Sequence, residues 1–159
     1  MTLNYLKLTL ILLLTQLTLA EKLEITSDTM HAESLNHEIH FVGNARVEQL
    51  KDWITADEII VYLNENNKTD RYEAIGKANF EFENEKGHYL GNADIVKYYP
   101  DKTIYELVGK AKTKDLLNKR TVKGEKITVN MKTGNSKVIG GKDKHGKNVP
   151  VKITLDTGN

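Results

Sequence analysis

An internal repeat constrains the fold of this chain more than any other feature of its sequence. Four segments begin with an acidic residue and continue with alternating apolar side chains, and each is followed by a segment that contains a glycine. The acids and glycines pair as Asp28 with Gly43, Asp57 with Gly76, Asp94 with Gly109, and Glu125 with Gly140. The separations are 15, 19, 15 and 15 residues, and the first three glycines are 33 residues apart. Such a regular register indicates tandem structural units that stack on one another.

Each unit has the alternation of a half-buried β-strand. Ile59, Val61 and Leu63 occupy every second position, whereas Lys97 and Lys126 stand at the opposite parity of their own units. Because successive side chains of a strand point to opposite faces, each unit has one apolar and one solvated face. Turn-forming residues recur about every ten residues, and no long helical pattern follows the N-terminal segment. The sequence therefore predicts an all-β fold with an antiparallel sheet.

The alanine two residues after each of the first three glycines predicts where the strands bend. Ala45, Ala78 and Ala111 stand at this position in the first three units. Glycine inside a strand pattern often marks a sharp bend or a close approach of two backbones, and a small neighbour fits such a site. We expect a bend at the same point of every unit.

Residues 1–20 have the layout of a secretory signal peptide. A weakly basic start that includes Lys7 precedes an apolar run over Leu8–Leu14, and small residues at Thr18 and Ala20 fit a cleavage site. The apolar run is shorter than the roughly 20 residues that a membrane span needs. We expect export and cleavage after about Ala20, which leaves one domain over residues 21–159. An uncleaved N-terminal anchor is the alternative.

The amino-acid composition argues against several kinds of functional site. The chain has no cysteine, which excludes a thiol nucleophile and a thiolate metal site, so its core and its strand pairing must hold an exported fold together. Without Lys7 the domain has 22 basic and 22 acidic side chains, because the whole chain has 23 and 22. This balance gives no indication of nucleic-acid binding.

No pattern in the sequence predicts catalysis or a cofactor. The repeated acids occupy the same point of each unit, so we expect them to form turns by bonding local backbone N–H groups rather than to form a catalytic carboxylate pair. A secreted polysaccharide enzyme on a repetitive β scaffold is the competing hypothesis, and clustered carboxylates in a cleft would mark it. His37 and His40 point to opposite faces of a strand, so the histidines are expected at the surface or in turns, without a bound metal.

These features together resemble the LptA family, periplasmic lipopolysaccharide-transport proteins with an OstA-like domain. The stretches that carry the resemblance are Leu23–Asp28, Phe41–Ala45, Ile54–Asp57, Gly91–Asp94, Gly124–Ile127 and the tail Lys144–Pro150. The resemblance covers nearly all of residues 21–159. The turn at Leu50–Trp53, a four-residue insertion in the second unit and a short tail depart from the family pattern.

The resemblance implies a fold, a function and partners. The fold is an open-ended β-jellyroll of many short antiparallel strands. The function is non-enzymatic: a carrier in the periplasm that binds lipopolysaccharide and stacks head to tail into a bridge, which moves lipopolysaccharide from the inner to the outer membrane during outer-membrane assembly. An LptC-like inner-membrane protein and an LptD-like outer-membrane protein would hold its ends. An LptC-like component tethered to the inner membrane is the alternative.

The resemblance also implies that the acyl chains of lipid A lie in the apolar interior. Leu23 and Ile25 match the family's lipid-contacting first strand, and Phe80 and Tyr98 align with its aromatic groove contacts. The same interior would be lined by Phe41, Ile59, Val61, Val96, Leu107 and Val129. Without the resemblance, these apolar stripes would simply predict a dry, closed core.

Overall fold

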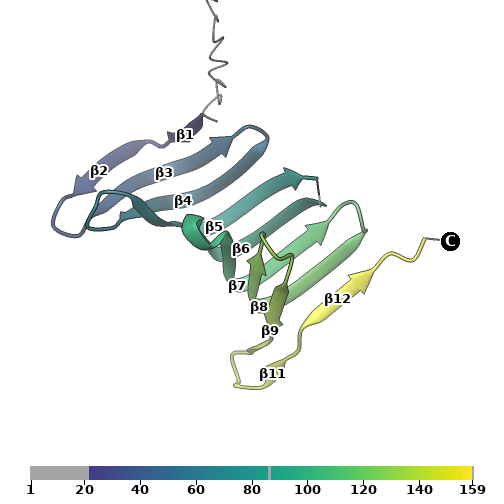
Figure 1. Cartoon of the computed structure of the whole chain (residues 1–159). Helices are drawn as coiled ribbons and strands as arrows, with labels where there is room; N and C mark the ends of the chain where they lie inside the picture. Colours follow the sequence, from purple (N-terminus) through teal and green to yellow (C-terminus); the bar gives the residue numbers. More distant parts are fainter. Residues whose placement is uncertain (1–21, 86, 159) are drawn as a thin grey trace, which may run out of the picture.

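The computed structural model describes residues 22–85 and 87–158, and the expected signal peptide over residues 1–20, with its cleavage point, lies outside this part of the chain. The described residues form one antiparallel sheet of ten strands in the order β1-β3-β4-β5-β6-β7-β8-β12, with β2 beside β3 and β9 beside β8. The sheet twists from β1 to β12 and does not close on itself (Figure 1). This confirms the predicted all-β, open-ended jellyroll.

The sheet consists of a long central meander with short strands at its two ends. The long strands are β3 (Glu38–Gln49), β4 (Asp52–Leu63), β5 (Thr69–Asn84), β6 (Gly87–Tyr99), β7 (Ile104–Asp115) and β8 (Arg120–Asn130). The end strands are β1 (Leu23–Thr26), β2 (Thr29–Glu33), β9 (Ser136–Ile139) and β12 (Lys152–Leu155). A separate pair joins β10 (Gly141–Lys142) to β11 (Asn148–Val149), and the 3₁₀ turn η1 (Pro100–Lys102) connects β6 to β7. No helix in the described residues is long and apolar enough to cross a membrane.

Strands β3, β5 and β7 each contain two consecutive residues with left-handed backbone. In β5, Gly76 has φ +83° and Lys77 has φ +48°, and the same pair recurs at Gly43–Asn44 and Gly109–Lys110. The pairing register shifts at each of these points, so the two residues form a β-bulge. A bulge bends its strand and increases the local twist. Segments that the sequence suggests as short strands therefore join into long strands that bend at the glycines.

Each repeated acid lies against a glycine of a neighbouring strand. The side chains of Asp28, Asp57 and Asp94 occupy the space where a Cβ atom on Gly43, Gly76 and Gly109 would lie. The Asp28 backbone N–H also donates to the Gly43 carbonyl oxygen at 2.8 Å. The acids thus act between strands, which corrects the expectation that they serve local turns.

The fourth pairing differs from the predicted one by one residue. The side chain of Glu125 lies beside Gly141, with its Cβ 3.0 Å from the position of an added Cβ, whereas Gly140 lies against the Val149 carbonyl. Gly141 begins β10, which is outside the main sheet, and it therefore does not interrupt a long strand as the other glycines do.

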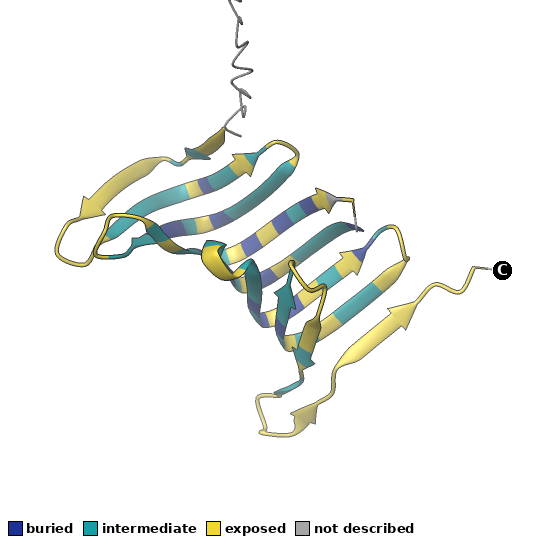
Figure 2. Cartoon of the chain, viewed as in Figure 1, coloured by how far each residue is buried: buried dark blue, intermediate teal, exposed yellow. Residues whose placement is uncertain are grey.

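The core lies on the inner face of the sheet. Ile59, Val96 and Leu107 are the largest fully buried side chains. Ala45, Ala78 and Ala111 are also buried, which confirms the close packing predicted after each glycine. Figure 2 shows buried and exposed positions alternating along the long strands, as a sheet with one apolar face requires.

Ion pairs tie neighbouring strands together on the outer face. The Glu73 carboxylate is buried and accepts from Arg71 Nε at 2.9 Å and Lys97 Nζ at 3.1 Å. Burial opposes the charged form of Glu73, but the two cations outweigh burial and hold the pKa of Glu73 below its usual range. The Arg71 guanidinium also lies 3.6 Å over the Tyr62 ring.

We predict that Gly76→Ala destabilises the fold more than Gly134→Ala does. Both glycines have positive φ, but no atom lies within 4 Å of a Cβ on Gly134, whereas a Cβ on Gly76 would meet Asp57. Backbone strain costs about 1–2 kcal/mol at either position, and the close contact should add about 1–3 kcal/mol at Gly76. Urea denaturation of both variants measures the difference. Equal losses would contradict a close approach at the bend.

We predict that Glu73→Gln lowers stability at neutral pH and that this effect disappears in acid. Because the folded-state pKa of Glu73 lies below 4.5, its stabilisation is complete above that pH and is lost as pH falls through the folded pKa. We expect a loss of about 1–3 kcal/mol near neutral pH. Urea titrations over a pH series measure it, with Glu65→Gln in an exposed turn as the control. A stability difference between Glu73→Gln and the wild type that is as large in acid as at neutral pH would contradict the lowered pKa of Glu73.

Candidate lipid-binding groove

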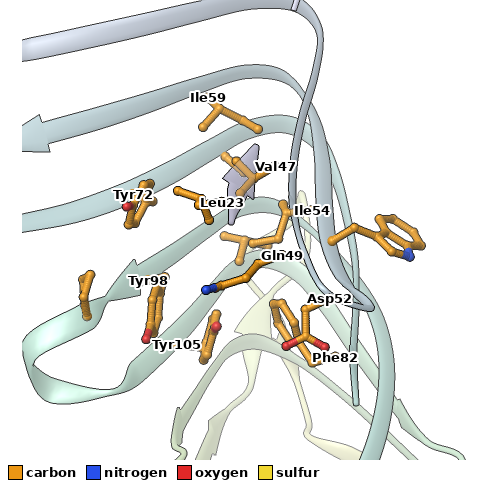
Figure 3. Close-up of a pocket in the computed structure, with 14 residues that line it drawn as sticks. Leu23, Val47, Gln49, Asp52, Ile54, Ile59, Tyr72, Phe82, Tyr98 and Tyr105 are labelled. Atoms are coloured by element: carbon orange, nitrogen blue, oxygen red, sulfur yellow. The ribbon is translucent and has the colours of Figure 1, made fainter. Parts of the chain in front are cut away.

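A hollow of about 330 Å³ opens on the inner face of the sheet. Its lining comes from β1 and from β3 to β7, together with Pro100 of η1. Apolar side chains predominate, and Val47, Ile54 and Ile59 lie on one side of it (Figure 3). Gln49 and Asp52 are the polar members, at the end of the β3–β4 hairpin. The concave face of the bent sheet thus retains an open apolar space beside its packed core.

Aromatic rings from three adjacent strands form a continuous row in this region. The ring centroids of Tyr72 and Tyr98 are 6.2 Å apart, and those of Tyr98 and Tyr105 are 4.3 Å apart. Phe82 continues the row at 4.6 Å from Tyr105 and contacts Phe80 at 4.9 Å. Aromatic rings provide a large apolar area with little rotational freedom to lose on binding.

The row follows directly from the strand register. Tyr72 pairs with Tyr98, and Tyr98 pairs with Tyr105, so all three side chains point to the same face. Phe82 lies on that face too, because it is an even number of positions from Tyr72 and its ring contacts that of Tyr105. Figure 3 shows the rings of Tyr72, Tyr98 and Tyr105 lying one after another across three strands.

The hydroxyls of Tyr98 and Tyr105 stay neutral over the physiological range. Burial raises the pKa of Tyr105, and the neighbouring Tyr98 raises it further. Burial also raises the pKa of Tyr98, with a smaller contribution from Tyr72. The hollow is therefore uncharged beside these two rings and suits the apolar part of an amphipathic molecule.

The structure brings four of the ten predicted lipid-contact residues into the hollow. These four are Leu23, Ile59, Val96 and Tyr98. Ile25 is paired with Val47 and shares its inward face, while Phe41 and Val129 are partly buried beside the core. Val61, Phe80 and Leu107 are buried and do not line the hollow. Lipid contact by any of the ten stays a prediction.

Other lining residues were not singled out as lipid contacts from the sequence. They include Val47, Ile54, Tyr72, Ala74, Phe82 and Tyr105. The alternation of apolar residues could have indicated Phe82, because it continues the inward-facing stripe that contains Phe80. To predict that Tyr72 and Tyr105 line the hollow, the registers of the β5–β6 and β6–β7 hairpins must be known, and alternation alone does not give them.

Both ends of the sheet expose apolar side chains. Leu23 and Met30 at one end are 42% and 61% exposed, and Ile153 and Leu155 at the other end are 60% and 58% exposed. Their pairing partners place them on the inner face, because Met30 is opposite Phe41 and Ile153 is opposite Val122. The inner apolar surface thus continues to both edges of the sheet.

The histidines include a group that the sequence does not predict. His31 and His40, nine positions apart, lie directly opposite each other in the β2–β3 pair on the outer face. The spacing of His37 and His40 can be read from the sequence. The contact of His31 with His40 depends on the register of the β2–β3 hairpin, which the sequence does not give.

Comparison with known proteins agrees with this geometry. The family described as "LptA/(LptD N-terminal domain) LPS transport protein" matches residues 24–135. The crystal structure of LptH superposes with a TM-score of 0.71 at 14% identity, covering 86% of this chain and 96% of that chain. LptH is described as the LptA-homologous periplasmic component of the conserved lipopolysaccharide transport device of Pseudomonas aeruginosa. No curated protein matches the sequence.

The two comparisons support different conclusions. At 14% identity, the likeness to LptH shows the fold. The family match extends over most of the chain and includes all four repeated acids and the first three glycines of the repeat. The chain therefore belongs to the LptA/LptD N-terminal domain family of lipopolysaccharide transport proteins, which is a family of transport proteins and not of enzymes.

Proposed function

We propose that this chain is an exported carrier that binds lipopolysaccharide in the periplasm and forms part of a bridge between the inner and outer membranes. The observation that carries the proposal is the open apolar hollow on the inner face of the sheet. Removal of residues 1–20 by signal peptidase would release the domain over residues 21–159. The comparison with LptH, a periplasmic component, supports this location.

The hollow suits the acyl chains of lipid A. Each CH₂ group that leaves a lipid phase for water costs about 0.8 kcal/mol, so a chain of a dozen such groups loses roughly 10 kcal/mol. An apolar surface that excludes water removes much of this cost. The predicted contacts at Leu23, Ile59, Val96 and Tyr98, together with the unpredicted Tyr105 and Phe82, would supply that surface. The sugars would remain outside in water.

The exposed ends of the sheet suit assembly. A strand with an unpaired edge can accept a strand from another chain by β-augmentation. Pairing of the β1–β2 end of one copy with the β9–β12 end of the next would align their inner faces. A head-to-tail contact of this kind does not close on itself and gives an open filament. LptC-like and LptD-like proteins would occupy its two ends at the membranes.

Transfer along such a filament would need no covalent chemistry. Lipid would move between stations of similar affinity, and the direction would come from its supply and removal at the two ends. The family match, which names LptA and LptD, supports a soluble bridge component in preference to the tethered, LptC-like alternative. N-terminal sequencing of the chain isolated from cells distinguishes them, because a cleaved leader leaves no anchor.

We predict that a photo-crosslinking amino acid at Tyr98 captures lipopolysaccharide in living cells. Tyr98 lines the hollow, whereas its neighbour Lys97 lies on the outer face and pairs with Glu73. A crosslinker at Lys97 is therefore a matched control on the same strand. Immunoblotting of the purified adduct for lipopolysaccharide measures capture. Adducts at Lys97 and none at Tyr98 would contradict the proposed groove.

We predict that deletion of residues 152–159, which removes β12, abolishes concentration-dependent assembly. β12 lies at the edge of the sheet, contacts β8 and exposes Ile153 and Leu155, so its loss removes a docking edge but leaves the main core intact. Sedimentation velocity over a concentration series measures assembly, and the melting temperature controls for folding. Unchanged assembly of the folded deletion variant would exclude this edge.

A further inference from the structure

The outer face of the sheet carries a pair of stacked imidazole rings at the β2–β3 hairpin. His31 and His40 are directly paired residues of these strands. Their ring centroids are 4.7 Å apart, and the ring planes differ by 6°. Paired side chains of adjacent strands share one face, and the flanking Met30 and Phe41 point to the other. The two imidazoles therefore present their nitrogens together, away from the groove.

A carboxylate lies within reach of both rings. Glu33 Oε1 is 3.6 Å from His31 Nε2 and 4.0 Å from His40 Nε2. Asn36 Nδ2 donates to the other oxygen, Glu33 Oε2, at 2.8 Å and thereby orients the carboxylate. The ligand atoms of the two histidines and Glu33 all lie within 4.8 Å of one another. Donors about 2.0–2.2 Å from a tetrahedral zinc ion lie about 3.4 Å apart. To complete this geometry, the two imidazole rings must turn out of their parallel stack so that the in-plane nitrogen lone pairs meet at one ion, and Glu33 must move closer to His40.

A second layer of carboxylates supports the rings. Glu58 Oε1 is 2.7 Å from His40 Nδ1, and Glu38 Oε2 is 3.0 Å from His40 Nε2. A carboxylate that accepts a hydrogen bond from the N–H of one imidazole nitrogen fixes the tautomer, so that the other nitrogen can bind a metal. Glu58 stands in this orienting position, whereas Glu38 contacts the His40 nitrogen that would face the ion.

The charge of the group favours a cation. Glu33, Glu38 and Glu58 contribute three carboxylates around two imidazoles. Among the described residues, no lysine or arginine forms an ion pair with any of the three. His40 is half-buried while His31 is exposed, so an ion can enter from solvent.

We propose that His31, Glu33 and His40 bind one Zn²⁺ ion on the outer face, with a water molecule in the fourth position and Glu58 orienting His40. Imidazole and carboxylate donors in a tetrahedral arrangement suit zinc, whereas Mg²⁺ prefers six oxygen ligands. The ion would fasten the exposed end strand β2 to β3, because each strand contributes ligands. The site is independent of the proposed lipid groove, which lies on the opposite face.

Isothermal titration of the untagged domain over residues 21–159 with ZnCl₂ tests the proposal. We expect one ion per chain, and at least a 100-fold weaker affinity in His31→Ala/His40→Ala. Glu58→Gln should weaken binding by about 10–100-fold, since it leaves the ligands in place and removes their support. His88→Ala is the matched control, because His88 pairs with Glu81 at 2.7 Å on another part of the sheet, and it should bind zinc as the wild type does.

Thermal unfolding gives a second measurement. Zinc should raise the melting temperature of the wild type and of His88→Ala but not of the double variant, and MgCl₂ should have no such effect. The double variant should unfold cooperatively without zinc, because β2 is exposed and contributes nothing to the buried core. Failure of the wild type to bind zinc saturably, or equal affinity in the double variant, would overturn the proposal.

Discussion

The structure depends on a single backbone feature that recurs along the sheet. A glycine and the residue after it have left-handed backbone, and an acidic side chain from the adjacent segment of the chain covers the glycine. Strands of 11 to 16 residues would otherwise extend as a gently twisted ribbon with both faces open to water. The bulges at Gly43, Gly76 and Gly109 bend β3, β5 and β7 at one level. This bend makes the inner face concave, so the same repeat creates both the packed core and the hollow beside it.

The two faces of the sheet are stabilised in different ways. On the inner face, Ile59, Val96 and Leu107 exclude water and the aromatic row extends this apolar surface. On the outer face, ladders of opposite charge connect consecutive strands, as Glu73 does with Lys97. A domain without disulfides can therefore remain ordered although its apolar face is incompletely filled, and the proposed lipid binding would use the unfilled part of that face.

Much of the fold could be predicted from the sequence because neighbouring residues within each repeat show which face is buried and where the strand bends. The alternation after Asp57 places Ile59 and Val61 on the buried face, and the alanines after the glycines mark the bends. Features that depend on pairing between strands could not be predicted in this way. The contact of Tyr98 with Tyr105 requires the tight turn at η1, and the pairing of His31 with His40 requires the β2–β3 register. The contact between Glu125 and Gly141 arises because the last unit leaves the main sheet after β9.

The division of the end strands has a consequence for what the sheet can pair with. At one end β1 covers one half of β3 and β2 covers the other half, and β12 and β9 divide β8 in the same way. An incoming straight strand can therefore align with only one half of either end, which is too short a contact to hold it. Only a sheet whose strands bend at the same level can pair along the whole edge. The bend thus protects a sheet with two unpaired edges against non-specific aggregation, and it still allows pairing with domains that have the same bend.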